Sequence, residues 1–413
     1  MIDFVNFILF NQDLQIPHAV LAVMVDFSKA FNRINHNIIV TILSEMGVPG
    51  WLLNIVIGFL TDRELIVRYK GGCSSRKALP GGGPQGTRLG LFLFLILINA
   101  AGYPHLEKHL GLKMTGSVNK RTPMPNTHMK YVDDMSLAQS LNLKNCLIPN
   151  PDPNPARPLA YHDRTHHLLP TDVCKLQEQL DNLEDYCQRN QMVINEGKTK
   201  VMLFNTARKY DGMPNLTLSG MGGANLDVVE KFKLLGVMLR SDMKWYDNTE
   251  YICKKGYARL WMIRRLKGLG ASVAEMLDVY QKQVRSVLEL AVPVWQPALT
   301  QQERREIERV QRCAFYVILG DAYNGYEQAL DLLECDNLDD RREKLCQNFA
   351  KKAWKNPKYQ NWFTLNDEPL PTINTRSEAT RVRNVLKPIV TRTDRYMNSP
   401  LPYLTEVLNK LMK

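Results

Sequence analysis

The stretch HMKYVDDMSLA, His128–Ala138, places two adjacent aspartates between two segments that carry apolar residues. This pattern predicts a β-strand, a tight acidic turn and a second strand. Asp133 and Asp134 repel each other when both are ionised, and a bound cation relieves that repulsion. Their carboxylate oxygens suit Mg²⁺, although an exposed Asp-Asp turn without a metal explains the same residues about equally well.

A third carboxylate belongs to Asp26, which directly follows the apolar run LAVMV, Leu21–Val25. A continuous apolar run of this length indicates a buried central strand. Asp26 is therefore either the N-cap of the next helix or a metal ligand at a sheet edge. If this strand lies beside the hairpin of Asp133 and Asp134, the three carboxylates can hold two Mg²⁺ ions about 3.5–4 Å apart, as in-line phosphoryl transfer requires.

The glycine-rich segment PGGGPQG, Pro80–Gly86, predicts a loop that opens into an apolar helix ending near Ala101. It is not a phosphate-binding Walker loop, because no lysine followed by serine or threonine stands at the required spacing. Glycines allow a ligand to approach the backbone closely, and Gln85 can hydrogen-bond a base or a sugar. A plain Gly-Pro turn is the alternative.

The chain of 413 residues has 53 lysines and arginines against 42 aspartates and glutamates, a formal net charge of +11. The excess indicates a polyanionic partner such as nucleic acid, or a solvated basic surface. Its eight cysteines include no C-x-x-C pair, which argues against a zinc finger and favours a reducing compartment. The N-terminus lacks the basic residues of a signal peptide, and the most apolar stretch, Leu91–Ile98, is too short to span a bilayer. We therefore expect an intracellular protein with no membrane partner.

In their order along the chain, these motifs resemble the palm of reverse transcriptases, in detail that of non-LTR (LINE-type) retrotransposons. The resemblance spans roughly residues 20–240 and rests on VDFSKAFN, LPGGGPQGTRLGLFLFLILIN, MKYVDD, INEGKTKVMLF and FKLLGV. A looser match covers residues 281–300 and 307–320. The resemblance implies an α+β right-hand polymerase palm, an antiparallel sheet with helices, followed by a helical thumb and a helical C-terminal extension. We expect these parts at residues 1–244, 245–320 and 321–413, the first with a remnant of the fingers.

The same resemblance implies an RNA-directed DNA polymerase of a transposable element. It would transfer nucleotides from dNTPs to a DNA primer on an RNA template, using two Mg²⁺ ions, with the nucleus as the expected compartment and the cytoplasm as the alternative. Lys198 matches a lysine proposed as general acid to the leaving pyrophosphate, although a surface lysine in a turn has the same sequence pattern. Phe232–Val237 resembles the grip that holds the primer end. The remaining matches are the metal ligands Asp26, Asp133 and Asp134, and the nucleotide-binding residues Phe31, Gln85, Gly86 and Tyr131.

A basic segment, Lys254–Lys267, holds six basic residues, no acid, and two interspersed aromatic residues. We expect Lys254, Lys255, Arg264 and Arg265 to contact phosphates while the aromatic rings stack on bases or sugars. The alternative is an amphipathic helix whose Leu260, Trp261 and Ile263 are simply core.

Two departures from the family pattern stand out. Asn32 replaces the second aspartate of many relatives, and only 25 residues precede Asp26, so most of the fingers is missing. We also find no endonuclease, RNase H or Cys/His-knuckle pattern, and expect an N-terminally truncated chain. The first alternative is therefore a catalytically inactive relic that binds RNA or DNA. A palm-like nucleotidyl cyclase is a third class, and the PQG loop and the basic segment argue against it.

Overall fold

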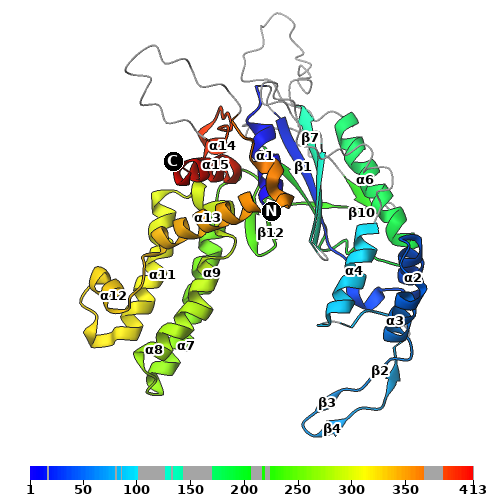
Figure 1. Cartoon of the computed structure of the whole chain (residues 1–413), viewed down its shortest axis with the longest axis horizontal. Coiled ribbons are helices and arrows are strands. Elements are labelled where there is room, and N and C mark those ends of the chain that lie inside the picture. Colours follow the sequence, from blue (N-terminus) through cyan, green and yellow to red (C-terminus); the bar gives the residue numbers. More distant parts are fainter. Residues whose placement is uncertain are drawn as a thin grey trace, which may run out of the picture.

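The computed structural model describes residues 1–15, 18–79, 81–84, 86–100, 126–131, 134–142, 170–205, 216–218, 224–366 and 385–412. Its centre is a five-stranded sheet with the strand order β11-β8-β1-β7-β6 (Figure 1). The strands are β1 (His18–Val25), β6 (Asn126–Tyr131), β7 (Asp134–Asn142), β8 (Lys200–Phe204) and β11 (Asp227–Val228). Neighbouring strands are antiparallel except β8 and β11, which run parallel, so the predicted antiparallel sheet has one parallel edge pair.

The central strand β1 is buried along its whole length, as its apolar run predicted. It pairs with β7 on one edge and with β8 on the other, and its side chains are buried on both faces in two hydrophobic clusters. The register sets Val25 opposite Met135 in β7, and Tyr131 in β6 opposite Asp134. This confirms the predicted hairpin. It also places the last residue of β1 beside the start of β7, at one end of the central strands of the sheet.

The two faces of the sheet pack against different helices because side chains alternate along a strand. Leu21 and Val23 point to one face, where they join a hydrophobic cluster that includes residues of four helices. These are α2 (His36–Glu45), α3 (Gly50–Leu60), α4 (Arg88–Ala100) and α6 (Pro170–Arg189). In α6, Leu176, Leu180 and Leu183 recur at helical spacing and are fully buried on this face.

The opposite face of the sheet, with Val20 and Met24, packs on α1 (Ile2–Gln12). The same hydrophobic cluster continues into the helices that follow Trp245 and into the C-terminal helices (Figure 1). The larger of these are α7 (Tyr246–Gly268), α8 (Val273–Val279), α11 (Gln301–Leu319), α12 (Tyr326–Leu332), α13 (Leu338–Lys355), α14 (Asp394–Met397) and α15 (Pro400–Leu411). The change to helical structure at Tyr246 falls where the sequence predicted it, while the division into three domains stays a prediction.

Two hairpins project from this framework. One consists of β12 (Lys231–Leu234) and β13 (Val237–Arg240) and lies between the sheet and α7. The other, residues 64–78, follows α3 and extends from the body of the molecule (Figure 1). None of the helices in the described parts of the chain is long and apolar enough to cross a membrane. The proline- and histidine-rich segment 149–169 lies outside the described residues.

Candidate active site

A pocket of about 450 Å³ lies at the sheet edge where β1 ends, facing the β12–β13 hairpin. Carboxylates of Asp26 and Asp134 line it from the sheet. Its other charged lining residues are basic: Lys198, Lys200, Lys231 and Lys233. Two of these lysines belong to the hairpin, while Lys198 and Lys200 lie beside and in β8 of the sheet. Lys200 and Lys231 also pair with Asp227 and Asp247, so the positive charge open to a polyanion comes chiefly from Lys198 and Lys233.

Asp26 is held by its backbone. Its N–H donates to Oγ1 of Thr199 at 3.3 Å, and its carbonyl accepts from the N–H of Asn195 at 2.7 Å. The next helices are capped by Lys29 and Asn35, so the N-cap interpretation of Asp26 is wrong. Its side chain is free of that duty and faces the pocket instead.

Lys198 lies in a turn between Asn195 and Thr199, the two residues whose backbone and side chain bind Asp26. The N–H groups of Lys198 and Thr199 both donate to the carbonyl of Asn195 and so form this turn. The Nζ atom of Lys198 lies 3.5 Å from Oδ2 of Asp26, and the lysine side chain is 70% exposed. An exposed pair of this kind contributes about 0–1 kcal/mol to stability. The pair therefore sets the position of the two groups rather than holding the fold together.

The described carboxylates fit a cation. Oδ2 of Asp26 is buried and has no hydrogen-bond donor among the described residues. A buried anionic oxygen without a hydrogen bond is costly; its nearest positive charge is Nζ of Lys198 at 3.5 Å, and a bound cation would compensate it further. Asp134 begins β7 beside Asp26 and is half-buried in the same pocket. Asp133 lies outside the described residues, and among those described no cluster of three His, Cys, Asp or Glu side chains is found.

The glycine-rich loop is anchored to the segment after β1. The carbonyl of Gly82 accepts hydrogen bonds from Nε2 of His36 and Nη1 of Arg63, each at 2.9 Å. The N–H of Gly83 donates to the carbonyl of Phe31 at 2.7 Å. Gly86 has φ +83°, which glycine adopts without strain. Gln85 lies outside the described residues.

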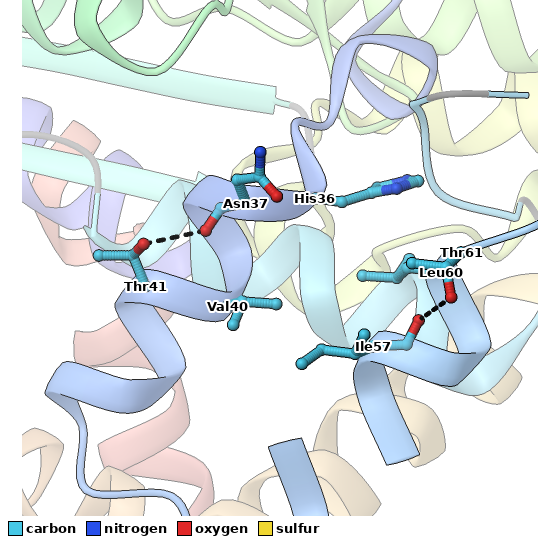
Figure 2. Close-up of a pocket in the computed structure, with 7 residues that line it drawn as sticks. All are labelled: His36, Asn37, Val40, Thr41, Ile57, Leu60 and Thr61. Atoms are coloured by element: carbon cyan, nitrogen blue, oxygen red, sulfur yellow. Dashed lines mark hydrogen bonds between the residues drawn. The ribbon is translucent and has the colours of Figure 1, made fainter. Parts of the chain in front are cut away.

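His36 and Arg63 were missed by sequence reasoning, because nothing in their local pattern shows a contact to a distant carbonyl. His36 also lines a second pocket of about 290 Å³ between α2 and α3 (Figure 2). The hydroxyls of Thr41 and Thr61 in that pocket donate to carbonyls of their own helices (Figure 2). Because these hydroxyls and Nε2 of His36 already bond to backbone carbonyls, we interpret this second pocket as a gap between packed helices and not as a ligand-binding site.

A buried carboxylate, Asp247, fixes the β12–β13 hairpin. It binds Lys231, and it also accepts from Nη1 of Arg240 at 3.1 Å. Next to it, Oδ1 of Asn248 accepts from the N–H of Met238 at 3.1 Å. Burial alone would raise the pKa of Asp247, but the hydrogen bonds from Lys231 and Arg240 outweigh it and lower that pKa below its ordinary value. Sequence reasoning missed Asp247 as well.

Residues 10–239 match the family model of reverse transcriptases, described as RNA-dependent DNA polymerases. The chain belongs to the reverse transcriptase family. A curated relative, the probable RNA-directed DNA polymerase from transposon BS of Drosophila melanogaster, is 21% identical over 307 residues, which are 72% of this chain and 29% of the relative. Together these matches support a reverse transcriptase of the non-LTR retrotransposon type, as the motifs implied.

Two solved telomerase structures are similar at a lower level. The Candida albicans enzyme is 11% identical, with a TM-score of 0.33, and the match covers 87% of this chain and 51% of that one. The Candida tropicalis enzyme is 10% identical, with a TM-score of 0.38, at 87% and 50% coverage. This reverse transcriptase chain therefore spans about half the length of the telomerases, and less than a third of the transposon polymerase.

The aromatic residue of the reverse transcriptase motif, Phe31, lies in the 3-10 helix η1 (Ala30–Arg33). It is half-buried, and its ring stacks on Phe94 of α4 with centroids 4.5 Å apart. Phe31 is not among the described residues that line the pocket of Asp26. Tyr131 lies at the end of β6. Their roles in nucleotide binding remain predictions.

The basic segment of this reverse transcriptase forms most of α7. Lys254, Lys255, Arg264 and Arg265 are all exposed. Leu260 and Ile263 are core residues, but Trp261 is 60% exposed, so the purely structural interpretation is right for the first two and wrong for the third. The Nζ atom of Lys254 pairs with Oε1 of Glu250 at 2.7 Å, and that of Lys255 lies 4.6 Å from the ring centre of Tyr251.

Proposed function

We propose that this chain catalyses RNA-directed DNA synthesis, adding deoxynucleotides from dNTPs to the 3′-hydroxyl of a DNA primer on an RNA template. The observation that supports it best is the meeting of Asp26, Asp134 and Lys198 in one pocket whose opposite wall is basic. Its family membership supports the same reaction class.

Divalent metal ions are the general requirement of this family, and we propose two Mg²⁺ ions held by Asp26, Asp133 and Asp134. When bound, such a pair activates the attacking hydroxyl and balances charge on the leaving pyrophosphate. Oδ2 of Asp26 suits this role, because it is a buried anionic oxygen that accepts no hydrogen bond from the described residues, although Nζ of Lys198 lies 3.5 Å away.

In the reaction, the primer 3′-hydroxyl gives its proton to solvent and the bond from its oxygen to the α-phosphorus forms, while the bond from that phosphorus to the bridging oxygen of pyrophosphate breaks. Lys198 stands beside Asp26 and can donate its Nζ proton to that leaving oxygen. Lys231 and Lys233 of the β12–β13 hairpin line the pocket, with the ammonium group of Lys231 on Asp247 and that of Lys233 5.3 Å from the ring centre of Tyr251, and we propose that they bind primer phosphates. Asp247 positions Lys231 for this contact.

The rest of the proposal concerns the substrates. Phe31, Gln85, Gly86 and Tyr131 would bind the incoming nucleotide, and Lys254, Lys255, Arg264 and Arg265 the template–primer duplex. The RNA that is copied would be that of a transposable element, and the reaction would take place in the nucleus.

The test is primer extension on an RNA template with a DNA primer, dNTPs and Mg²⁺. We expect synthesis by the chain and a loss greater than about 100-fold in Asp26→Asn and in Asp133→Asn, as when a preorganised electrostatic group is removed. The matched control is Asp185→Asn, an exposed carboxylate on α6, which should leave synthesis unchanged.

A second readout is the melting temperature with and without Mg²⁺. A ligand bound only by the native state raises that temperature, and both variants should weaken the rise. A chain that binds template–primer but extends nothing, with a Mg²⁺ response equal in all variants, would instead be the inactive binding relic.

A further inference from the structure

An exposed stripe of three arginines and a tyrosine runs along α11. Arg305, Arg309, Arg312 and Tyr316 are spaced by four, three and four residues, which places them on one face of the helix. All four are exposed, and Tyr316 is 62% exposed. We propose that this stripe binds single-stranded RNA, as a second nucleic-acid surface separate from the catalytic pocket.

The acids of α11 leave the stripe's charge uncompensated. Glu303 accepts from the N–H and hydroxyl of Thr300, each at 2.7 Å, and so caps the helix. Glu308 accepts from the hydroxyl of Tyr326 and, at 3.0 Å, from the N–H of Leu338. Glu306 accepts from the side chain of Gln302 at 3.1 Å.

The neighbouring Arg304 shows how a structural arginine behaves in the same helix. Its Nη1 atom lies 2.6 Å from Oδ1 of Asp339, and its Nη2 donates to the carbonyl of Gln296 at 3.1 Å. Within the described parts of the chain, no ion pair joins Arg305, Arg309 or Arg312 to an acidic side chain, while the guanidinium of Arg312 lies 4.6 Å from the ring centre of Tyr326. Three exposed arginines without such partners favour an external polyanion.

Exposed aromatic rings beside the arginines favour an unpaired strand over a duplex. Tyr316 packs edge-on against Tyr323 with ring centres 5.5 Å apart, and leaves most of its own surface open. Tyr257 of α7 lies near Arg309 and is 38% exposed. Arginine and aromatic side chains together bind unpaired strands, because bases stack on the rings while the guanidinium groups contact phosphates.

The stripe does not belong to the catalytic pocket. On α7, Tyr251 lies toward the pocket, because Lys233, which lines it, has its Nζ atom 5.3 Å from the ring centre of Tyr251. Gly256 lies toward α11, where an added Cβ would sit 2.9 Å from Cγ1 of Val310. At 3.6 residues per turn these two positions are about 140° apart around α7. In Figure 1, α11 accordingly lies on the side of α7 away from α2, α3 and α4.

This inference goes beyond the polymerase reaction, and only the choice of RNA over DNA rests on the proposed function. The test is fluorescence anisotropy with a labelled single strand of about 20 nucleotides, long enough to cover one such site. The variant is the triple Arg305→Gln, Arg309→Gln, Arg312→Gln. Its matched control is Lys351→Gln, Lys352→Gln, Lys355→Gln on α13, which removes the same charge from other exposed positions.

At about 0.7 per phosphate for single strands, we expect the arginine triple to lower the slope of log affinity against log salt by about 2, and affinity at 0.1 M salt by about 100-fold. The control should keep the slope of the unmodified chain. Arg309→Lys alone, which keeps the charge, should keep the salt slope of the unmodified chain, and Tyr257→Ser with Tyr316→Ser should weaken binding without changing the slope.

Primer extension at saturating template–primer separates this inference from the proposed function, because the arginine triple should leave it unchanged. An unchanged salt slope, or an equal loss in the lysine control, would overturn the inference. So would parallel loss of duplex binding and extension, which would make the stripe part of the catalytic cleft. Tighter binding of single-stranded DNA of the same sequence would overturn the choice of RNA.

Discussion

Nζ of Lys198 lies 3.5 Å from Oδ2 of Asp26, although these residues belong to segments far apart in the sequence. The backbone joins the segments, because Phe27 bridges to Ile194 and the N–H of Ser28 donates to the carbonyl of Val193 at 2.8 Å. The turn that carries Lys198 is thus fixed to the end of β1, while the lysine side chain itself stays exposed. A lysine whose backbone is fixed while its side chain is exposed suits a group that contacts a charged substrate.

From this relationship we expect Lys198→Ala to lower the rate of nucleotide addition by about 100-fold, the lower range for loss of a general acid. The loss should fall on kcat rather than on the KM for dNTP. Lys198→Arg keeps the charge but not the acidity, so it should restore binding without restoring the rate. Single-turnover primer extension measures both. An equal loss in Lys244→Ala, an exposed lysine outside the pocket, would show that only surface charge matters.

The sequence predicted those parts of the site that depend on short-range pattern. The apolar run before Asp26 placed this residue at the end of a buried strand, and the alternation around Asp133–Asp134 predicted the hairpin. The contacts of His36 to Gly82 and of Asp247 to Lys231 were not predictable, since each joins side chains whose local sequence is ordinary. Trp261 was ambiguous for a related reason, because helical spacing alone cannot show which neighbours leave a residue open.

Phe31→Val should admit ribonucleotides into the primer-extension product while deoxynucleotide use falls modestly. A bulky ring under the sugar of the incoming nucleotide would collide with the 2′-hydroxyl, which is what separates the two sugars. The decisive measurement is an increase in ribonucleotide incorporation, because steric exclusion by Phe31 acts on ribonucleotides and hardly on deoxynucleotides.

The stacking of Phe31 on Phe94 supplies the competing outcome. An aromatic pair contributes about 0.5–1.5 kcal/mol beyond its buried area, so Phe31→Val also removes packing. Phe94→Leu is the matched variant, because it removes the same stacking from the other ring. If Phe31→Val and Phe94→Leu both lower the incorporation of deoxynucleotides and of ribonucleotides, with no gain for ribonucleotides, Phe31 has a structural role only.

Asp247→Asn should lower the free energy of unfolding at neutral pH by about 2 kcal/mol, because it weakens hydrogen bonds to two cations. The pKa of Asp247 is lower in the folded chain than its ordinary value, so its contribution is present above about pH 4, the unfolded value, and is lost as pH falls through the folded pKa. Denaturant titrations across that acid range should therefore show a smaller pH dependence in Asp247→Asn. Identical pH dependence in the two proteins would contradict the assigned role.

Replacing Lys254, Lys255, Arg264 and Arg265 with glutamine should reduce the salt dependence of template–primer binding, because each phosphate contact contributes about 0.9 to the slope on duplex DNA. The structure ranks these residues. Lys254 already pairs with Glu250 at 2.7 Å, so Lys254→Gln alone should change the slope less than Arg265→Gln. Filter binding at several salt concentrations gives the slopes. A slope that does not move in the quadruple variant would make α7 a structural helix only.

Gly90→Ala tests whether the glycine-rich loop must hold its conformation. An added Cβ at Gly90 would lie 2.3 Å from the carbonyl oxygen of Pro84 and 2.8 Å from Oγ1 of Thr87. The first of these atoms is backbone, so relief requires the Pro84–Thr87 turn itself to move. Because that turn contains Gly86 and directly precedes α4, we expect the KM for dNTP to rise while the fold persists.

The control for that variant is Gly58→Ala in α3, where nothing lies within 4 Å of the added Cβ. Alanine replaces glycine in a helix interior there, and should raise stability by about 0.5–1 kcal/mol with no effect on nucleotide use. The same chemical change is therefore expected to have opposite effects at the two positions. Thermal melting measures the effect on stability, and steady-state kinetics measures the effect on the KM for dNTP. If Gly90→Ala behaves like Gly58→Ala, the close approach of α4 to the loop has no part in nucleotide binding, and the resemblance of Gln85 and Gly86 to the family motif loses its structural support.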